Sequence, residues 1–200
     1  MENASAGHVT AFVLAGGKST RMGMDKAFVE FEGGTLLVRA LDLARSVTAD
    51  VRIVGRREKF AAFAQVVEDV FWDCGPLGGI HAALRDSPSE LNLMLAVDAP
   101  FVSGAFLQYL IGEARCAPEA SVVVPRGDGC RQPLCAIYRR EFVDAAENAL
   151  RAGRNRIDLL FEVVKTRVIE EEELEREGFS AAIFRNLNTP EELEAGKRRP

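Results

Sequence analysis

Glycines and cationic side chains gather near the N-terminus, directly after Val9–Leu14, an apolar segment that predicts a buried strand. The residues of this stretch that could do chemistry are Gly16, Gly17, Gly23, Lys18, Arg21 and Lys26. Glycine lets the backbone direct several N–H groups at one anion, and no side chain blocks the approach. Arginine offers a planar fork for phosphate oxygens, and lysine offers a mobile point charge. The stretch therefore predicts a polyphosphate-binding loop.

Two common phosphate-binding loops are excluded by spacing. Gly17-Lys18-Ser19 matches the end of a Walker A loop, but that motif also needs an earlier glycine, and Phe12 stands at its place. The G-x-G-x-x-G pattern of dinucleotide-binding folds is absent from the chain. A different class of phosphate site is expected.

A candidate metal ligand follows the most hydrophobic segment of the chain. Asp98 comes directly after Leu91–Val97, which predicts a central strand. In open α/β sheets, ligands bind outside the carboxyl ends of the strands, and Mg²⁺ prefers one or two carboxylates together with phosphate oxygens. The competing role, a cap for the next helix, is already supplied by Ser103. Asp98 is therefore predicted to hold Mg²⁺ on a triphosphate.

A second glycine-rich loop, Asp73–Ile80, precedes a predicted helix that starts near Ile80. It contains Gly75, Gly78 and Gly79, which permit close approach of the backbone to a ligand. The N-terminus of a helix favours an anion or a hydroxyl group. This loop is expected to help bind the nucleotide.

Two groups of polar residues are not explained by local structure. Asn186 and Asn188 place two amides on one side of an extended segment. A turn-rich loop contributes Arg126, Arg131 and Gln132, which are candidates for contact with a second substrate, and for which solvated loop charges are an equally good interpretation.

The remaining pattern predicts an α/β protein with a mostly parallel sheet and helices on both faces. Strands and helices alternate along the chain, which is typical of βαβ units. The expected strands are 9–14, 27–32, 51–54, 65–67, 91–97, 120–124, 132–138 and 165–169. The expected helices are 35–48, 57–64, 104–115, 140–151 and 155–161, with Thr35 and Ser103 as N-caps.

Composition narrows the class of protein. The chain has 200 residues, 48% hydrophobic and 28% charged, and a net charge of −5. These values suit one globular domain over residues 1–200, with residues 1–8 as a disordered lead-in. The negative charge argues against nucleic-acid binding, and no apolar run is long enough for a membrane span. Four cysteines without metal-site spacing, and no secretion signal, predict a cytoplasmic protein with reduced thiols.

Four motifs in order resemble those of the molybdenum cofactor guanylyltransferases, also called molybdopterin-guanine dinucleotide synthases. They are L-A-G-G-x-S-x-R-M-G-x-D-K from Leu14, G-P-L-G-G from Gly75, V-D-A-P-F from Val97 and N-x-N-T-P-E-E from Asn186. The resemblance implies a Rossmann-like, three-layer nucleotidyltransferase fold. It also implies transfer of GMP from GTP to molybdopterin, which releases pyrophosphate and forms the guanine dinucleotide form of the molybdenum cofactor.

The resemblance also implies roles for single residues. The nucleotide would be bound by Leu14, Ala15, Gly16, Gly17, Lys26, Asp69, Gly78 and Asp98. Arg21 and Lys26 would stabilise charge in the transition state, and Asp98 would bind Mg²⁺. Asn186 and Asn188 would face the pterin or the metal side. The chain departs from the family at Val97, where a cysteine is common, and at Val54, where some relatives have a nucleotide-contacting asparagine.

Other functions remain open at this point. A cytidylyltransferase acting on the same pterin, or a sugar- or alcohol-phosphate nucleotidyltransferase, would use the same fold. The sequence Ala15-Gly16-Gly17 favours guanine, since the cytidyl relatives tend to carry A-A-G. A non-catalytic GTP-binding module is the alternative outside enzymes, against which Lys26 and Asp98 argue together. Expected partners of the enzyme are the molybdoenzymes that accept the product, or a cofactor chaperone.

Overall fold

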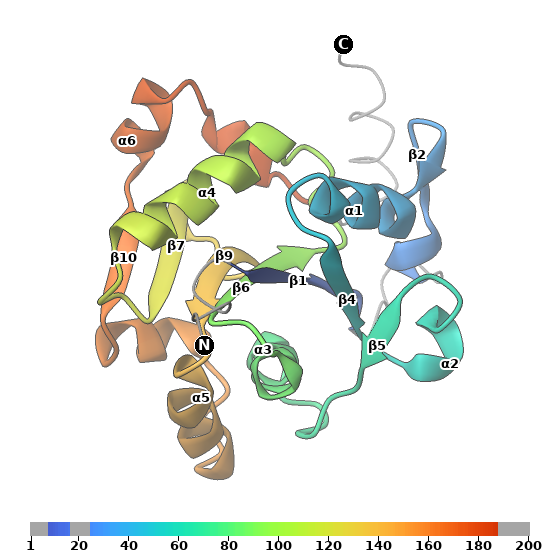
Figure 1. Ribbon diagram of the computed structural model, residues 1–200, viewed down its shortest axis with the longest axis horizontal. Coiled ribbons are helices and arrows are strands. Elements are labelled where there is room, and N and C mark those ends of the chain that lie inside the picture. The colour runs from blue at the N-terminus through green and yellow to red at the C-terminus, as the bar shows by residue number, and fades with distance from the viewer. Residues whose placement is uncertain (1–7, 17–24, 188–200) are drawn as a thin grey trace, which may run out of the picture.

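A computed structural model of the protein describes residues 8–16 and 25–187 and arranges them as a sheet between two layers of helices (Figure 1). The strands are β1 (Val9–Leu14), β2 (Glu30–Phe31), β3 (Gly34–Thr35), β4 (Asp50–Val54), β5 (Gln65–Val67), β6 (Leu91–Ala96), β7 (Val122–Gly127), β8 (Cys130–Arg131), β9 (Cys135–Arg139) and β10 (Thr166–Ile169). The α-helices are α1 (Leu36–Arg45), α2 (Arg57–Phe60), α3 (Pro76–Asp86), α4 (Gly104–Cys116), α5 (Phe142–Arg151) and α6 (Glu171–Arg176). The 3-10 helices are η1 (Lys26–Phe28), η2 (Ile157–Glu162) and η3 (Ala181–Phe184).

The main sheet has the strand order β10-β7-β9-β6-β1-β4-β5, with β8 paired to β7. Strands β5, β4, β1 and β6 run parallel, and β10 runs parallel to β7. Only β9 is antiparallel to both of its neighbours, β6 and β7, among the described strands of this path. The predicted α/β class with a mostly parallel sheet is confirmed.

Alternation along β1 divides the core between the two faces of the sheet. Ala11 and Val13 pack with residues of α1 and α4, whereas Phe12 and Leu14 pack with residues of α3 and α5. Figure 1 shows α1 and α4 on one side of the sheet and α3 and α5 on the other. Successive side chains of a strand point to opposite faces, so β1, which is buried along its whole length, is apolar except for Thr10, whose hydroxyl is bonded to Asp50 and Ser89. The result is the expected three-layer arrangement.

The strand order changes direction next to β1. From β1 the chain builds β4 and β5 on one side, and then crosses to β6 on the other side of β1. The connections that leave the carboxyl ends of β1 and β6 therefore lead to opposite halves of the sheet. In an open α/β sheet the carboxyl ends of such strands are the favoured place for a ligand, and the segments after Leu14 and Ala96 meet there.

Local signals placed several elements correctly. Thr35 caps α1 by accepting a hydrogen bond from the Val38 backbone N–H at 3.3 Å. Ser103 caps α4 by accepting one from the Phe106 backbone N–H at 3.2 Å. Both predicted N-caps are confirmed, and Ser103, not Asp98, caps α4.

Some predicted boundaries were wrong. The strand expected over residues 27–32 is the 3-10 helix η1 followed by the short β2, because Asp25 caps a turn by accepting from the Ala27 backbone N–H at 3.2 Å. Helix α3 begins at Pro76 and not near Ile80, since proline has the backbone angle of a first helical residue and Gly75 supplies a φ of 65° before it. Gly78 and Gly79 consequently lie inside the helix.

Two predicted helices near the surface are shorter than expected. The helix predicted over 57–64 ends at Phe60, and the one predicted over 155–161 is the 3-10 helix η2. Among the described residues, no helix has both the length and the apolar character needed to cross a membrane.

An ion-pair cluster joins β10 to α6 and α4 and leads to a stability prediction. Arg167 donates to Glu173 at 3.0 Å and to Glu113 at 2.8 Å. Hydrogen bonding by Arg167 lowers the pKa of Glu173 to about 2, well below the usual value for a glutamate. A carboxyl whose folded-state pKa is depressed stabilises the fold above its unfolded pKa and loses this contribution as the pH falls through the folded value.

We expect Glu173→Gln to lower the free energy of unfolding by about 1 kcal/mol at pH 7, because the pair is partly exposed to solvent. The difference from wild type should narrow as the pH falls from about 4.5 toward 2. Glutamine keeps an oxygen for the Glu170 backbone N–H, so the variant tests the charge. Urea unfolding over this pH range, with Glu175→Gln as the matched control on the same helix, measures it. A difference that does not depend on pH would contradict the assignment.

Candidate nucleotide-binding site

The carboxyl edge of β6 brings two predicted site residues together. Lys26, the first residue of η1, donates from Nζ to Asp98 Oδ2 at 2.9 Å, across 72 positions of sequence. The side chains are 22% and 18% exposed, so the pair can be reached from solvent but is shielded on most sides. A cation and a carboxylate at the carboxyl edge of the sheet are the groups expected to meet a metal-bound phosphate chain.

The C-terminal segment of the described chain joins the same edge. The Leu187 backbone N–H donates to the carbonyl of Asp98 at 3.1 Å. Leu187 is buried, and the side chain of its neighbour Asn186 is exposed. This bond brings Asn186 next to the turn that presents Asp98, although the two residues are far apart in sequence. Asn188 lies outside the described residues.

Backbone hydrogen bonds hold the start of the glycine-rich loop between two strands. The Ala15 N–H donates to the Val54 carbonyl at 3.0 Å, and the Val97 N–H donates to the Leu14 carbonyl at 3.2 Å. Residues Leu14 to Gly16 therefore extend past the sheet in a fixed direction, directly beside Val97-Asp98. Gly17 and Arg21, also predicted to bind, lie outside the described residues.

Asp69 carries an unusual carboxyl group at this edge. Its Oδ1 atom is buried and has no hydrogen-bond partner among the described residues, and burial raises the pKa of the group. A side chain on Gly79 would come within 3.7 Å of this oxygen and within 3.3 Å of Leu14 Cδ2 and Val54 Cγ1. Because buried polar atoms nearly always have partners, this oxygen is unusual, and the nucleotide contact expected of Asp69 stays a prediction.

Gly79 packs beside Leu14, Val54 and Asp69, whereas the sequence analysis had placed it in a ligand-binding loop. Because Gly79 has no side chain, the first turns of α3 lie close to Leu14, Val54 and Asp69. A larger residue at position 79 would crowd these neighbours. The signal was present in the glycine pair of the G-P-L-G-G motif. That motif was interpreted as a loop. Because Gly79 lies inside a helix, its packing role was not predicted.

Gly78 has a packing role of its own. An added Cβ would lie 2.9 Å from the carbonyl oxygen of Phe71, so any larger residue would push the segment before α3 away from the helix. The nucleotide contact expected of Gly78 stays a prediction. Val54, where some relatives have an asparagine, is a buried strand residue whose carbonyl binds Ala15.

The loop residues considered for a second substrate bind within the protein. Arg126 pairs with Glu170 at 2.7 Å, and Arg131 pairs with Glu162 at 2.6 Å. The Gln132 side-chain amide donates to the Gly127 carbonyl at 3.0 Å. These contacts give the three residues structural roles in the β7–β8 region, and neither of the two roles considered from the sequence is needed to explain them.

A metal ion at Asp98 would need ligands from the nucleotide. The described residues contain no group of three or more histidine, cysteine, aspartate or glutamate side chains that could hold a metal. One partly exposed carboxylate suits Mg²⁺, which keeps water and phosphate oxygens among its ligands, and does not suit a metal that requires a protein cage. The donor set therefore fits the expected cation when a triphosphate is present.

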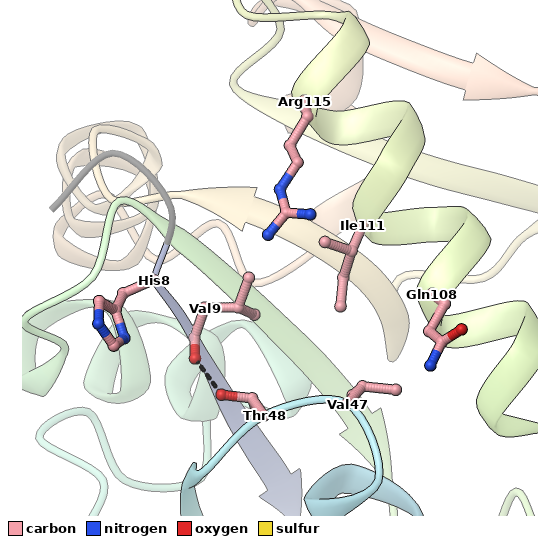
Figure 2. A pocket seen from close by; sticks show the side chains of 7 residues that line it. All are labelled: His8, Val9, Val47, Thr48, Gln108, Ile111 and Arg115. Carbon is pink, nitrogen blue, oxygen red and sulfur yellow. Dashed lines mark hydrogen bonds between the residues drawn. The ribbon is translucent and has the colours of Figure 1, made fainter.

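A separate pocket of about 360 Å³ lies at the opposite edge of the sheet, by the amino end of β1 (Figure 2). Its lining residues are His8, Val9, Val47, Thr48, Gln108, Ile111 and Arg115. Figure 2 shows the Thr48 hydroxyl directed at the Val9 carbonyl, to which it donates at 2.5 Å. None of the predicted site residues lines this pocket, so it is distinct from the predicted nucleotide-binding site at the carboxyl edge.

Comparison with known proteins identifies the family of this chain. Residues 11–176 match the family model of the MobA-like NTP transferase domain. A molybdenum cofactor guanylyltransferase from Desulfosudis oleivorans is 35% identical over 189 residues, which cover 93% of this chain and 93% of that protein. A relative with the same name from Syntrophotalea carbinolica is 30% identical and covers 94% of this chain and 90% of that protein.

Solved structures give the same result for the fold. The crystal structure of molybdopterin-guanine dinucleotide biosynthesis protein A from Archaeoglobus fulgidus superposes with a TM-score of 0.81 at 29% identity, over 94% of this chain and 96% of that one. A 4-diphosphocytidyl-2C-methyl-D-erythritol synthase from Anaerococcus prevotii has a TM-score of 0.71 at 16% identity, over 98% of each chain, and shares the fold alone. With a family model that spans most of its length and relatives matched along nearly all of it, this chain belongs to the MobA-like NTP transferase family of nucleotidyltransferases.

Proposed function

We propose that this protein transfers GMP from GTP to molybdopterin, releasing pyrophosphate and forming molybdopterin guanine dinucleotide. The observation that carries the proposal is the Lys26–Asp98 pair at the carboxyl edge of the sheet, beside the backbone of Leu14 to Gly16. The full-length relatives named molybdenum cofactor guanylyltransferase supply the substrate class.

The reaction needs no covalent intermediate with the protein. A phosphate oxygen of molybdopterin attacks the α-phosphorus of GTP, a new P–O bond forms, and the bond to the β-phosphate breaks as pyrophosphate leaves. The two substrates are anions, so the protein must position them and offset their repulsion. Lys26, together with Arg21, is assigned to the charge that develops on the α-phosphate and the leaving group.

Asp98 is assigned to Mg²⁺, which would neutralise phosphate charge when bound with the nucleotide. The Lys26 ammonium donates to the Asp98 carboxylate at 2.9 Å, so both charged groups lie at one place beside the start of the glycine-rich loop. Because the pair is partly exposed, exchanging this contact for phosphate and metal contacts costs little.

Asp69 is assigned to the nucleoside part of GTP. Its buried oxygen lacks a donor, and a nucleoside brings several N–H and O–H groups. Leu14, Ala15, Gly16 and Gly17 would line the nucleotide, Gly78 would lie near it, and Asn186 and Asn188 would meet the pterin side. The product would then pass to an acceptor molybdoenzyme or a cofactor chaperone.

Pyrophosphate release in the presence of Mg²⁺ and molybdopterin tests the proposal, with GTP, CTP and ATP compared in parallel. We expect release with GTP, and little with CTP or ATP. Release with CTP alone would keep the fold and mechanism but overturn the guanine assignment. Binding of GTP without release would favour the non-catalytic module, and omission of molybdopterin is the control for simple hydrolysis.

A further inference from the structure

A second ion pair lies one residue away from the catalytic lysine. Lys59, on the short helix α2, donates from Nζ to Asp25 Oδ2 at 2.6 Å. The other oxygen of Asp25 accepts from the Ala27 backbone N–H at 3.2 Å and thereby caps η1, the turn whose first residue is Lys26. One carboxylate thus connects α2 to the turn that presents Lys26.

Aromatic rings make a second connection between the same two segments. The ring of Phe28, at the end of η1, stacks on Phe60 with centroids 5.8 Å apart and an interplanar angle of 27°. It also contacts the ring of Phe63 at 6.1 Å. Phe60 is buried, whereas Phe28 and Phe63 are each 36% exposed, so this contact holds one side of η1 against the α2 segment.

The α2 segment is itself anchored to the nucleotide edge. The ring of Phe60 lies so close to Gly55 that an added Cβ would be 2.7 Å from it, and the same Cβ would be 3.7 Å from the backbone nitrogen of Gly16. The Gly55 N–H donates to the Val67 carbonyl at 3.0 Å. The segment from Gly55 to Phe60 therefore lies in a fixed position beside Gly16, at the start of the glycine-rich loop. Its contacts with Asp25 and Phe28 can hold η1 in place.

We infer that Lys59 is a positioning residue: through Asp25 it fixes η1 so that the Lys26 ammonium is held at Asp98, ready for the phosphates. This inference rests on the proposed function, because it concerns the same site. Lys59 reaches Lys26 only through the capped turn. An ion pair that is partly exposed, with Lys59 at 41% and Asp25 at 24%, contributes little to global stability, so its effect is expected in the geometry of Lys26.

The test is steady-state kinetics of Lys59→Met and Lys59→Arg with GTP. We expect kcat of Lys59→Met to fall about tenfold, because small displacements of a catalytic group are costly, while KM for GTP stays within about twofold. Lys59→Arg, which can still pair with Asp25, should recover most of the loss. A raised KM with unchanged kcat would mean that Lys59 binds the nucleotide directly, and it would overturn the inference.

A second variant separates the ion pair between Lys59 and Asp25 from the capping of η1 by Asp25. Asp25→Asn keeps an oxygen for the Ala27 N–H and loses the ion pair, so it should lower kcat to the same extent as Lys59→Met. The double variant should then be no worse than either single variant, since both remove one interaction. Additive losses would contradict the inference. Lys165→Met, which removes an exposed lysine just before β10, is the matched control and should leave kcat unchanged.

Amide hydrogen exchange gives a readout that does not require turnover. The Phe28 N–H donates to the Asp25 carbonyl at 3.0 Å, and the Val29 N–H donates to the Lys26 carbonyl at 3.1 Å. In Lys59→Met these two amides should exchange faster, while those of β1 and β6 keep their protection. Unchanged exchange at both would overturn the inference. If the wild-type protein releases no pyrophosphate but exchange responds to Lys59, the proposed function fails and the positioning contact stands.

Discussion

Replacing Asp98 with asparagine is expected to lower turnover by roughly 10²–10³-fold, the scale for loss of one preorganised electrostatic group. Asparagine has nearly the same shape and can still accept from Lys26, so the change removes the negative charge and little else. That charge is what a divalent cation on a triphosphate requires from the protein. Pyrophosphate release with GTP and molybdopterin measures the loss.

The Mg²⁺ dependence identifies the cause. In Asp98→Asn, half-maximal activity should require a higher Mg²⁺ concentration than in the wild type, and the fold should be kept, since a partly exposed ion pair contributes at most about 1 kcal/mol. Asp42→Asn, on the exposed face of α1, where Asp42 pairs with Arg45 at 3.4 Å, is the control and should behave as wild type. Turnover close to wild type in Asp98→Asn would exclude the metal role.

Lys26→Met is expected to lower kcat by a similar factor, roughly 10²–10³-fold, by a different route. The lysine charge acts on the α-phosphate and the leaving pyrophosphate, where negative charge increases in the transition state. The loss should therefore fall on kcat more than on KM for GTP. Steady-state kinetics with varied GTP separates the two constants.

Two comparisons make this second result specific. The Mg²⁺ concentration for half-maximal activity should be unchanged in Lys26→Met, in contrast to Asp98→Asn. Lys26→Arg should retain more activity than Lys26→Met, because the positive charge remains while its geometry changes. If Lys26→Met raised only the KM for GTP, the lysine would bind the ground state and would not be catalytic.

The sequence alone was sufficient for features that depend on neighbours along the chain. The hydrophobic runs of β1 and β6 predicted buried strands, and Thr35 and Ser103 predicted helix starts, because a cap acts within one turn. The residue types around Lys26 and Asp98 predicted phosphate and metal chemistry before either was placed in space. Boundaries failed at η1 and α3, where one capping residue or one proline changed the local geometry.

Tertiary structure decided which of these residues meet. The contact between Lys26 and Asp98 spans 72 positions and depends on β6 pairing with β1, which no local pattern specifies. No local pattern specifies three further contacts. They are the hydrogen bond from Leu187 to Asp98, the packing of Gly79 beside Asp69, and the ion pair between Lys59 and Asp25. Local preferences act over a few residues, whereas strand order and register follow from packing the whole core. The sequence therefore determined the chemistry available to this protein, and the packed sheet determined its arrangement into one site.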